Sequence, residues 1–167
     1  MQREIRRYSD YLVSIGTGVA LFGIWTVVRM IMGIILERET IIGEMQGDVE
    51  LSKSLIFITI SAILVLLSLF ILSIHMYIGL SARSEGLGLK KKNGYLIATV
   101  VYTVIYCIGI ISEILFFQGY FKNVIDGVVT IIIDITMLIT FVELMINAIR
   151  VRKLSGKLTE AGCKNAG

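Results

Sequence analysis

Five ionisable side chains lie inside long apolar stretches of this 167-residue chain: Arg29, His75, Glu113, Asp134 and Glu143. A charge placed in hydrocarbon is costly, so each of these side chains should face a partner, water or a bound ion. Intramembrane carboxylates of this kind serve as proton or cation sites, and a neighbouring arginine supplies the counter-charge. The five residues therefore direct the search for chemistry to the interior of a membrane.

The charges of this set do not balance. Three carboxylates accompany one permanent cation, Arg29, and a histidine that is neutral or charged. At least one acid must then be protonated, bound to a cation or exposed to water. Depths follow from the rise of roughly 1.5 Å per helical residue. They predict an outer layer that pairs Arg29 with Glu113 or Asp134, and an inner layer that pairs His75 with Glu143. The competing interpretation is that such pairs are structural and fix the register of the helices.

A polar stripe follows one predicted helix, and its members are separated by steps of three and four residues: Tyr95, Thr99, Tyr102, Tyr106, Gly109 and Glu113. This spacing places all of them on one helical face. Tyr102, Tyr106 and Glu113 are predicted to line a cavity, because this face is more polar than packing requires. Helix packing is the alternative, since membrane helices place small and hydroxyl-bearing residues at their contacts. Two further stripes suit that alternative: Gly16, Ala20 and Gly23, and Ser54, Ser61, Ser68 and His75.

The elements that must position these residues follow from composition. Hydrophobic residues make up 56% of the chain, charged residues 17%, and proline is absent. A mean hydropathy of +0.83 excludes an ordinary soluble domain, a disordered chain and a nucleic-acid module. Four apolar stretches, at about 11–36, 54–80, 95–117 and 124–149, each exceed the roughly 20 residues that cross a bilayer as a helix. The predicted fold is an all-α integral membrane bundle of four transmembrane helices, a single domain over residues 1–167.

Lysine and arginine predict the orientation of this bundle. Twelve of the sixteen basic residues fall in the N-terminal segment, the loop after the second span and the C-terminal tail 150–167. The positive-inside rule places these three segments, and so both termini, in the cytoplasm, with the protein in the plasma membrane. We expect the inner loop, at about 84–94, to be flexible, and the tail to run on as a basic amphipathic helix on the membrane surface. Anionic lipid headgroups are the predicted partners of Arg83, Lys90, Lys91, Lys92, Arg150, Arg152 and Lys153.

Other chemistry finds no support in the residues. The two cysteines, Cys107 and Cys163, lie at different levels, so no disulfide is expected. No metal-site spacing, no cofactor motif and no nucleophile–base pair is present, which argues against an enzyme. A helical membrane domain without such motifs is expected to need no cofactor, no metal and no nucleic acid.

Two functions from different classes remain. The first is a transporter or channel-like component that moves a proton, a small cation or an amphiphilic cation along a polar path inside the bundle. The second is a non-catalytic membrane partner, such as a subunit, an immunity protein or a regulatory protein, whose intramembrane charges are structural. Four helices with so little soluble mass can enclose only a small cavity alone, so a homo-oligomer or a membrane-protein partner is expected in either case.

Overall fold

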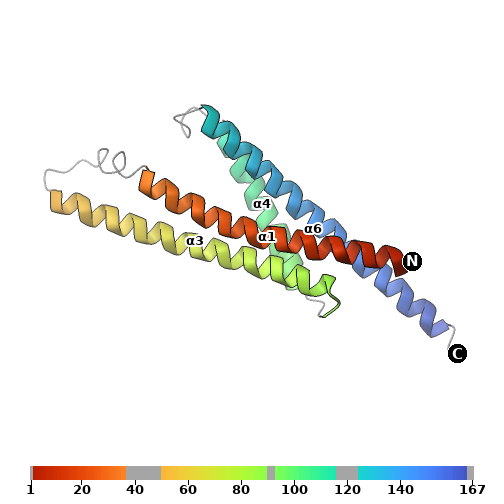
Figure 1. Cartoon of the computed structure of the whole chain (residues 1–167). Coiled ribbons are helices and arrows are strands. Elements are labelled where there is room, and N and C mark those ends of the chain that lie inside the picture. The colour runs from red at the N-terminus through yellow and green to blue at the C-terminus, as the bar shows by residue number, and fades with distance from the viewer. Residues whose placement is uncertain (1, 37–49, 90–92, 116–123, 165–167) are drawn as a thin grey trace. The chain divides into compact units, whose positions relative to one another are not determined.

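The computed structural model describes residues 2–36, 50–89, 93–115 and 124–164, and these form four α-helices (Figure 1). They are α1 (Gln2–Leu36), α3 (Glu50–Gly86), α4 (Gly94–Leu115) and α6 (Val124–Lys164). Each contains a window long and apolar enough to cross a membrane. No strand occurs within the described ranges. The all-α prediction with four membrane-spanning helices is confirmed, whereas the cytoplasmic position of the termini stays a prediction.

Three of the helices extend well beyond the predicted apolar stretches. Helix α1 begins at Gln2 rather than near residue 11, α3 continues through Gly86, and α6 runs without interruption through Lys164. Apolar composition marks the part of a helix that suits lipid, but helices end where caps or breakers end them. The tail is helical as predicted, as a direct continuation of α6 rather than as a separate helix.

The first half of the predicted inner loop belongs to the end of α3 and to the hydrogen-bonded turn that follows it. After α3 ends, the amide of Gly88 donates to the carbonyl of Glu85 at 2.9 Å, and that of Leu89 donates to Ser84 at 3.0 Å. Gly88 has a φ of 74°, a left-handed conformation that glycine adopts at little cost just past a helix end. At the start of α4, the carbonyl of Asn93 accepts hydrogen bonds from the amides of Leu96 and Ile97. Residues 90–92 lie outside the described ranges.

The chain divides into two compact units, and both boundaries fall inside helices. Unit 1 comprises Met1–Val19 and Tyr77–Gly167, so it holds the first part of α1, the last part of α3, and all of α4 and α6. Unit 2 comprises Ala20–Met76, the remainder of α1 and α3.

Within unit 1, glycines bring α1 and α3 into backbone contact. A Cβ atom added at Gly16 would lie 2.6 Å from the carbonyl oxygen of Gly79 and 2.9 Å from the amide nitrogen of Arg83. One added at Gly86 would lie 2.8 Å from the carbonyl oxygen of Ser9. Only a residue without a side chain permits such an approach, which is how small residues join membrane helices. The packing interpretation of Gly16 is therefore confirmed.

Within unit 2, α1 and α3 meet at one comparable point. A Cβ atom at Gly23 would lie 2.5 Å from the Cβ of His75 and 3.3 Å from a methyl of Leu72. His75 is fully buried, and its Nδ1 lies 2.9 Å from the carbonyl oxygen of Ile71 on its own helix. Ser68, one heptad earlier, is also buried. At His75 this stripe thus lies at a contact between α1 and α3.

Candidate functional site

The seven predicted site residues fall in both units. Tyr102, Tyr106, Glu113, Asp134 and Glu143 belong to unit 1, and Arg29 and His75 belong to unit 2. The predicted pairs Arg29–Glu113, Arg29–Asp134 and His75–Glu143 each join one unit to the other, and they stay predictions. Arg29 is exposed on α1, and Glu113 is half-buried on α4.

Within unit 1 the structure brings Tyr106 of α4 together with Asp134 of α6. The Tyr106 hydroxyl donates to Oδ1 of Asp134 at 2.6 Å and lies 3.6 Å from the sulfur of Met137. Asp134 is only 7% exposed. A buried carboxylate requires such a donor, because unsatisfied polar atoms in an apolar setting are costly. Sequence analysis selected both residues but did not predict this pair.

Aromatic rings fill the space beside this hydrogen bond. The Tyr102 and Tyr106 rings are stacked with centroids 5.8 Å apart. Both also contact Phe141 of α6, at 5.3 and 6.4 Å between centroids, in the tilted arrangements that aromatic pairs favour. Phe141 itself is 1% exposed. The tyrosine face of α4 is therefore an α4–α6 packing surface at these two residues.

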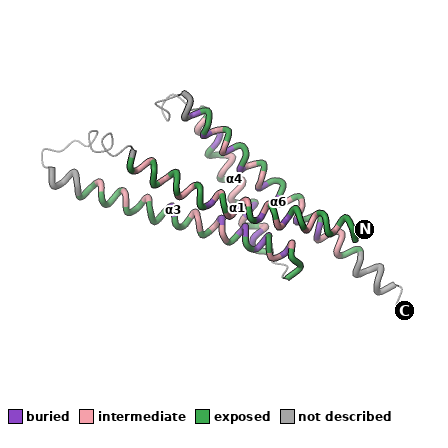
Figure 2. The backbone as a smooth tube through the Cα atoms, in the orientation of Figure 1, coloured by how far each residue is buried: buried purple, intermediate pink, exposed green. Residues whose placement is uncertain are grey.

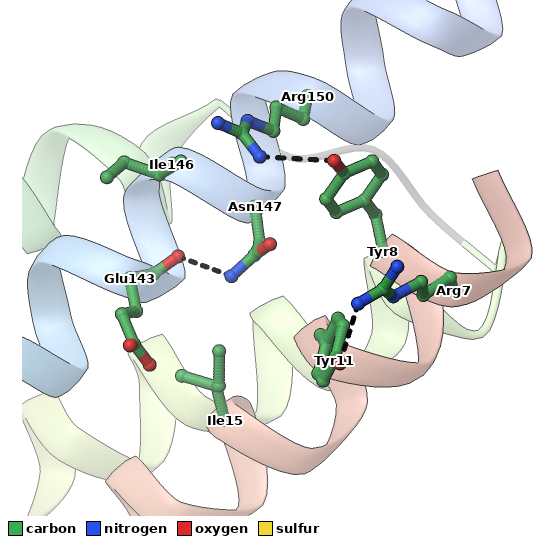
Figure 3. A pocket seen from close by; sticks show the side chains of 8 residues that line it. All are labelled: Arg7, Tyr8, Tyr11, Ile15, Glu143, Ile146, Asn147 and Arg150. Atoms are coloured by element: carbon green, nitrogen blue, oxygen red, sulfur yellow. Dashed lines mark hydrogen bonds between the residues drawn. The ribbon is translucent and has the colours of Figure 1, made fainter. Parts of the chain in front are cut away.

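Glu143 lies on the opposite side of α6 from Asp134. Nine residues separate them, which at 100° per residue is half a turn from one face to the other. Accordingly, Asp134 meets α4, whereas Glu143 lines a pocket that α6 forms with α1 (Figure 3). Helix α6 thus has neighbours on two sides, as the spacing of its acids predicted.

The pocket between α1 and α6 has a volume of about 460 Å³. Ligand pockets typically span a few hundred to a thousand cubic ångströms. Four residues come from each helix, and Figure 3 shows their side chains around the cavity. They are Arg7, Tyr8, Tyr11 and Ile15 from α1, and Glu143, Ile146, Asn147 and Arg150 from α6.

Two guanidinium groups stand at one end of this pocket, each held by a tyrosine. Arg150 donates to the Tyr8 hydroxyl at 3.1 Å and lies 5.4 Å from the centre of its ring. Arg7 donates to the Tyr11 hydroxyl at 3.4 Å and lies 5.6 Å from the centre of that ring. A guanidinium has five N–H donors, so these bonds use one donor of each group. The ring faces add cation–π attraction.

The carboxylate of Glu143 stands at the other end. Glu143 is exposed, and its backbone carbonyl accepts a bond from the Asn147 amide at 2.8 Å. Within the described part of the chain, its carboxylate has no hydrogen-bond or salt-bridge partner. Seven residues separate Glu143 from Arg150, which corresponds to about 10 Å along α6. The pocket therefore carries opposite charges at its two ends.

A second charged cluster, which sequence analysis missed, ties α6 to the end of α3. Arg152 donates through Nε and Nη2 to the two carboxylate oxygens of Glu85, both at 2.5 Å, and through Nη1 to Asn93 Oδ1 at 2.5 Å. Its guanidinium also lies 5.8 Å from the centre of the Tyr95 ring. Glu85 and Tyr95 are both buried. Bidentate pairing of this kind is the strongest arginine–carboxylate geometry.

A signal for this cluster was present in the sequence. Glu85 is the one acid in a predicted cytoplasmic loop that is otherwise basic. An isolated acid in such a loop indicates a salt bridge to a basic side chain. The predicted lipid contacts of Arg150 and Arg152 stay predictions, although both side chains have protein partners. Arg83 and Lys153 are exposed. Lys90, Lys91 and Lys92 lie outside the described residues.

Comparison with known proteins does not assign the chain to a family. No protein-family model matches the chain, and neither a curated protein nor a solved structure matches it significantly. Among the described residues, no three histidine, cysteine, aspartate or glutamate side chains gather as a metal site would require. The site must therefore be interpreted from its own geometry.

Proposed function

We propose that this protein is a small transporter that accepts a cationic group at Glu143 and moves it through the membrane. The observation that carries the proposal is the exposed carboxylate of Glu143. It lines a pocket and belongs to a helix long and apolar enough to cross a membrane. It has no partner among the described residues. Such a carboxylate is costly in lipid unless water or a cation reaches it. A structural charge would instead be neutralised by a neighbour, as Glu85 is.

The shape of the pocket favours an amphiphilic cation over a bare ion. A dehydrated metal ion needs several converging oxygens, whereas this pocket offers one carboxylate and an amide. Ile15, Ile146 and Tyr11 add aliphatic and ring surface to the same pocket. Sites for small organic ligands combine such apolar walls with a few polar groups that fix orientation.

Asp134 is the proposed next binding site for the transported cation or proton along α6. It lies nine residues from Glu143, about 13 Å along the helix, and its bond to Tyr106 provides a hydroxyl that can pass a proton. We assign Glu113 to a later part of the same path, and Arg29 and His75 stay predicted members of it. The proposal places the protein in the plasma membrane with both termini cytoplasmic.

A flux assay in proteoliposomes tests this function. Purified protein is reconstituted, and uptake of a fluorescent lipophilic cation and of protons is recorded for the wild type and Glu143→Gln. We expect transport by the wild type and a loss of at least about tenfold in the variant, since a charge-assisted contact is removed. Thr136→Val is the matched control, because Thr136 is exposed on the same helix and bonds its own backbone.

The second candidate is the non-catalytic membrane partner. It is favoured by the Glu85–Arg152 and Tyr106–Asp134 pairs, which show that this chain uses charged groups to join its own helices. In that case the wild type carries no flux of any tested cation. Exchanging the charges of Arg29 and Glu113 would then preserve folding and function, and a partner protein would copurify from native membranes.

A further inference from the structure

The pocket between α1 and α6 has positive charges at one end and a negative charge at the other. This arrangement restricts the chemical class of ligand that can bind there. The Arg7 and Arg150 guanidinium groups carry two positive charges at one end, while Glu143 carries a negative charge two helical turns away. A purely cationic ligand satisfies the carboxylate and leaves the two guanidinium groups without an anion. A purely anionic ligand satisfies the arginines and leaves the carboxylate without a cation. A ligand with both charges satisfies both ends.

The arginine end suits a phosphate. Guanidinium forks match phosphate oxygens with paired hydrogen bonds, and two forks on facing helices can hold one group from both sides. Tyr8 and Tyr11 fix the direction of these forks through a hydrogen bond and a ring contact each. Side chains held in place beforehand lose less entropy when a ligand binds. Basic pockets between membrane helices are typical sites for lipid phosphate.

The opposite end suits a primary ammonium. Glu143 supplies carboxylate oxygens and Asn147 an amide oxygen, which together accept the several hydrogen bonds that an ammonium donates. Ile15 and Ile146 line the same pocket with aliphatic surface that can contact an acyl chain or glycerol backbone. Figure 3 shows the Glu143 carboxylate beside Ile15, and the guanidinium of Arg150 beside Tyr8.

We infer that this pocket binds an aminoalkyl phosphate, with the phosphate between Arg7 and Arg150 and the ammonium at Glu143. A phospholipid with an ethanolamine headgroup presents this chemistry inside the membrane, and free phosphoethanolamine presents it in solution. The inference rests on the proposed function in one respect, that Glu143 receives the cationic group, and it names the substrate class of that site.

Competitive lipid binding to the full chain tests the inference. Three lipids with identical acyl chains are offered to the purified protein in micelles, and bound lipid is counted by native mass spectrometry. They are phosphatidylethanolamine, phosphatidylglycerol, which lacks the ammonium, and a trimethylammonium lipid, which lacks the phosphate. We expect the ethanolamine lipid to bind at least about tenfold more tightly than either of the others.

Variants assign each end of the ligand. Arg7→Gln with Arg150→Gln should reduce binding of the ethanolamine lipid about tenfold or more, and lysine at both positions should restore part of it. Glu143→Gln should abolish the preference over phosphatidylglycerol. Arg3→Gln with Arg6→Gln is the matched control, because it removes the same charge from exposed positions of α1 that do not line the pocket. Circular dichroism verifies that every variant is folded.

Several results would overturn the inference. Equal binding of phosphatidylglycerol, unaffected by Glu143→Gln, would leave only an anion site. Equal binding of the trimethylammonium lipid, unaffected by the arginine pair, would overturn the inference while the proposed function stands. Selective binding without any flux would overturn the proposed function alone. Displacement of bound lipid by equimolar phosphoethanolamine would assign the same chemistry to a soluble ligand, and failure to displace it would assign it to lipid.

Discussion

The contacts that stabilise unit 1 from within differ from those that stabilise unit 2. In unit 2 the buried residues of the described part are Gly23, Ser68 and His75. Most large aliphatic residues of this unit are exposed, and Figure 2 shows α1 and α3 coloured mainly as exposed and intermediate. In unit 1 a core of aliphatic and aromatic side chains is buried, and charged groups are buried with it. Glu85 is 4% exposed and Asp134 is 7% exposed.

Lipid explains why both arrangements are stable. Exposed aliphatic side chains cost nothing against hydrocarbon, so unit 2 needs only the close approach of its helices at Gly23 to join them. Buried polar groups find no partner in lipid, so those of unit 1 must pair with one another. Unit 2 should therefore be sensitive to side-chain size at one glycine, and unit 1 to the loss of charged partners.

The largest loss of stability is expected from breaking the Glu85–Arg152 salt bridge. Glu85→Ala leaves the Arg152 guanidinium without its carboxylate and should lower the free energy of unfolding by about 3 kcal/mol. Unfolding in mixed micelles with increasing sodium dodecyl sulfate, followed by circular dichroism, measures this. Replacing both residues by methionine should recover most of the loss, because no unpaired charge remains. A loss below about 0.5 kcal/mol for Glu85→Ala would place the bridge among weak surface pairs.

A smaller effect is expected at the glycine contact of unit 2. Gly23→Ala adds a Cβ atom 2.5 Å from that of His75, so the helices must separate. The same unfolding titration should show a loss of about 2 kcal/mol. Gly33→Ala is the matched control on the same helix, because nothing lies within 4 Å of its added Cβ. That control should be neutral or gain up to about 1 kcal/mol from helix propensity. Equal effects of the two substitutions would contradict this account.

The smallest effect is expected at the α4–α6 hydrogen bond. Tyr106→Phe keeps the ring against Phe141 and removes the donor to Asp134. A double-mutant cycle with Asp134→Asn should give a coupling free energy of about 1 kcal/mol, the scale of hydrogen bonds between membrane helices. A coupling near zero would mean that ring packing alone joins these helices.

The sequence predicted the elements better than it predicted their partners. The four apolar stretches identified all four helices, because length and hydropathy alone decide whether a helix can cross a bilayer. Helix ends were placed less well. Caps such as Gly88 depend on local hydrogen bonds, and they lie outside the apolar pattern that marks a span.

Site residues were predicted in type but not in arrangement. Asp134 and Glu143 were identified from their cost in lipid, and their opposite faces followed from helical geometry. The Glu85–Arg152 pair was missed because two residues 67 positions apart meet only through packing of α3 against α6. The pocket with Arg7 and Arg150 was missed for the same reason, since its walls come from the two ends of the chain.

The sequence by itself determined that this chain has four helices long and apolar enough to cross a membrane, and which of its charged residues lie within them. It could do so because hydrophobicity and helical period are properties of single segments. Only the tertiary structure decided that Tyr106 bonds Asp134, that Arg152 bonds Glu85, and that Glu143 faces a pocket. Those outcomes depend on which helix faces meet and how closely, and close approach is set by contacts between distant residues such as Gly16 and Gly79.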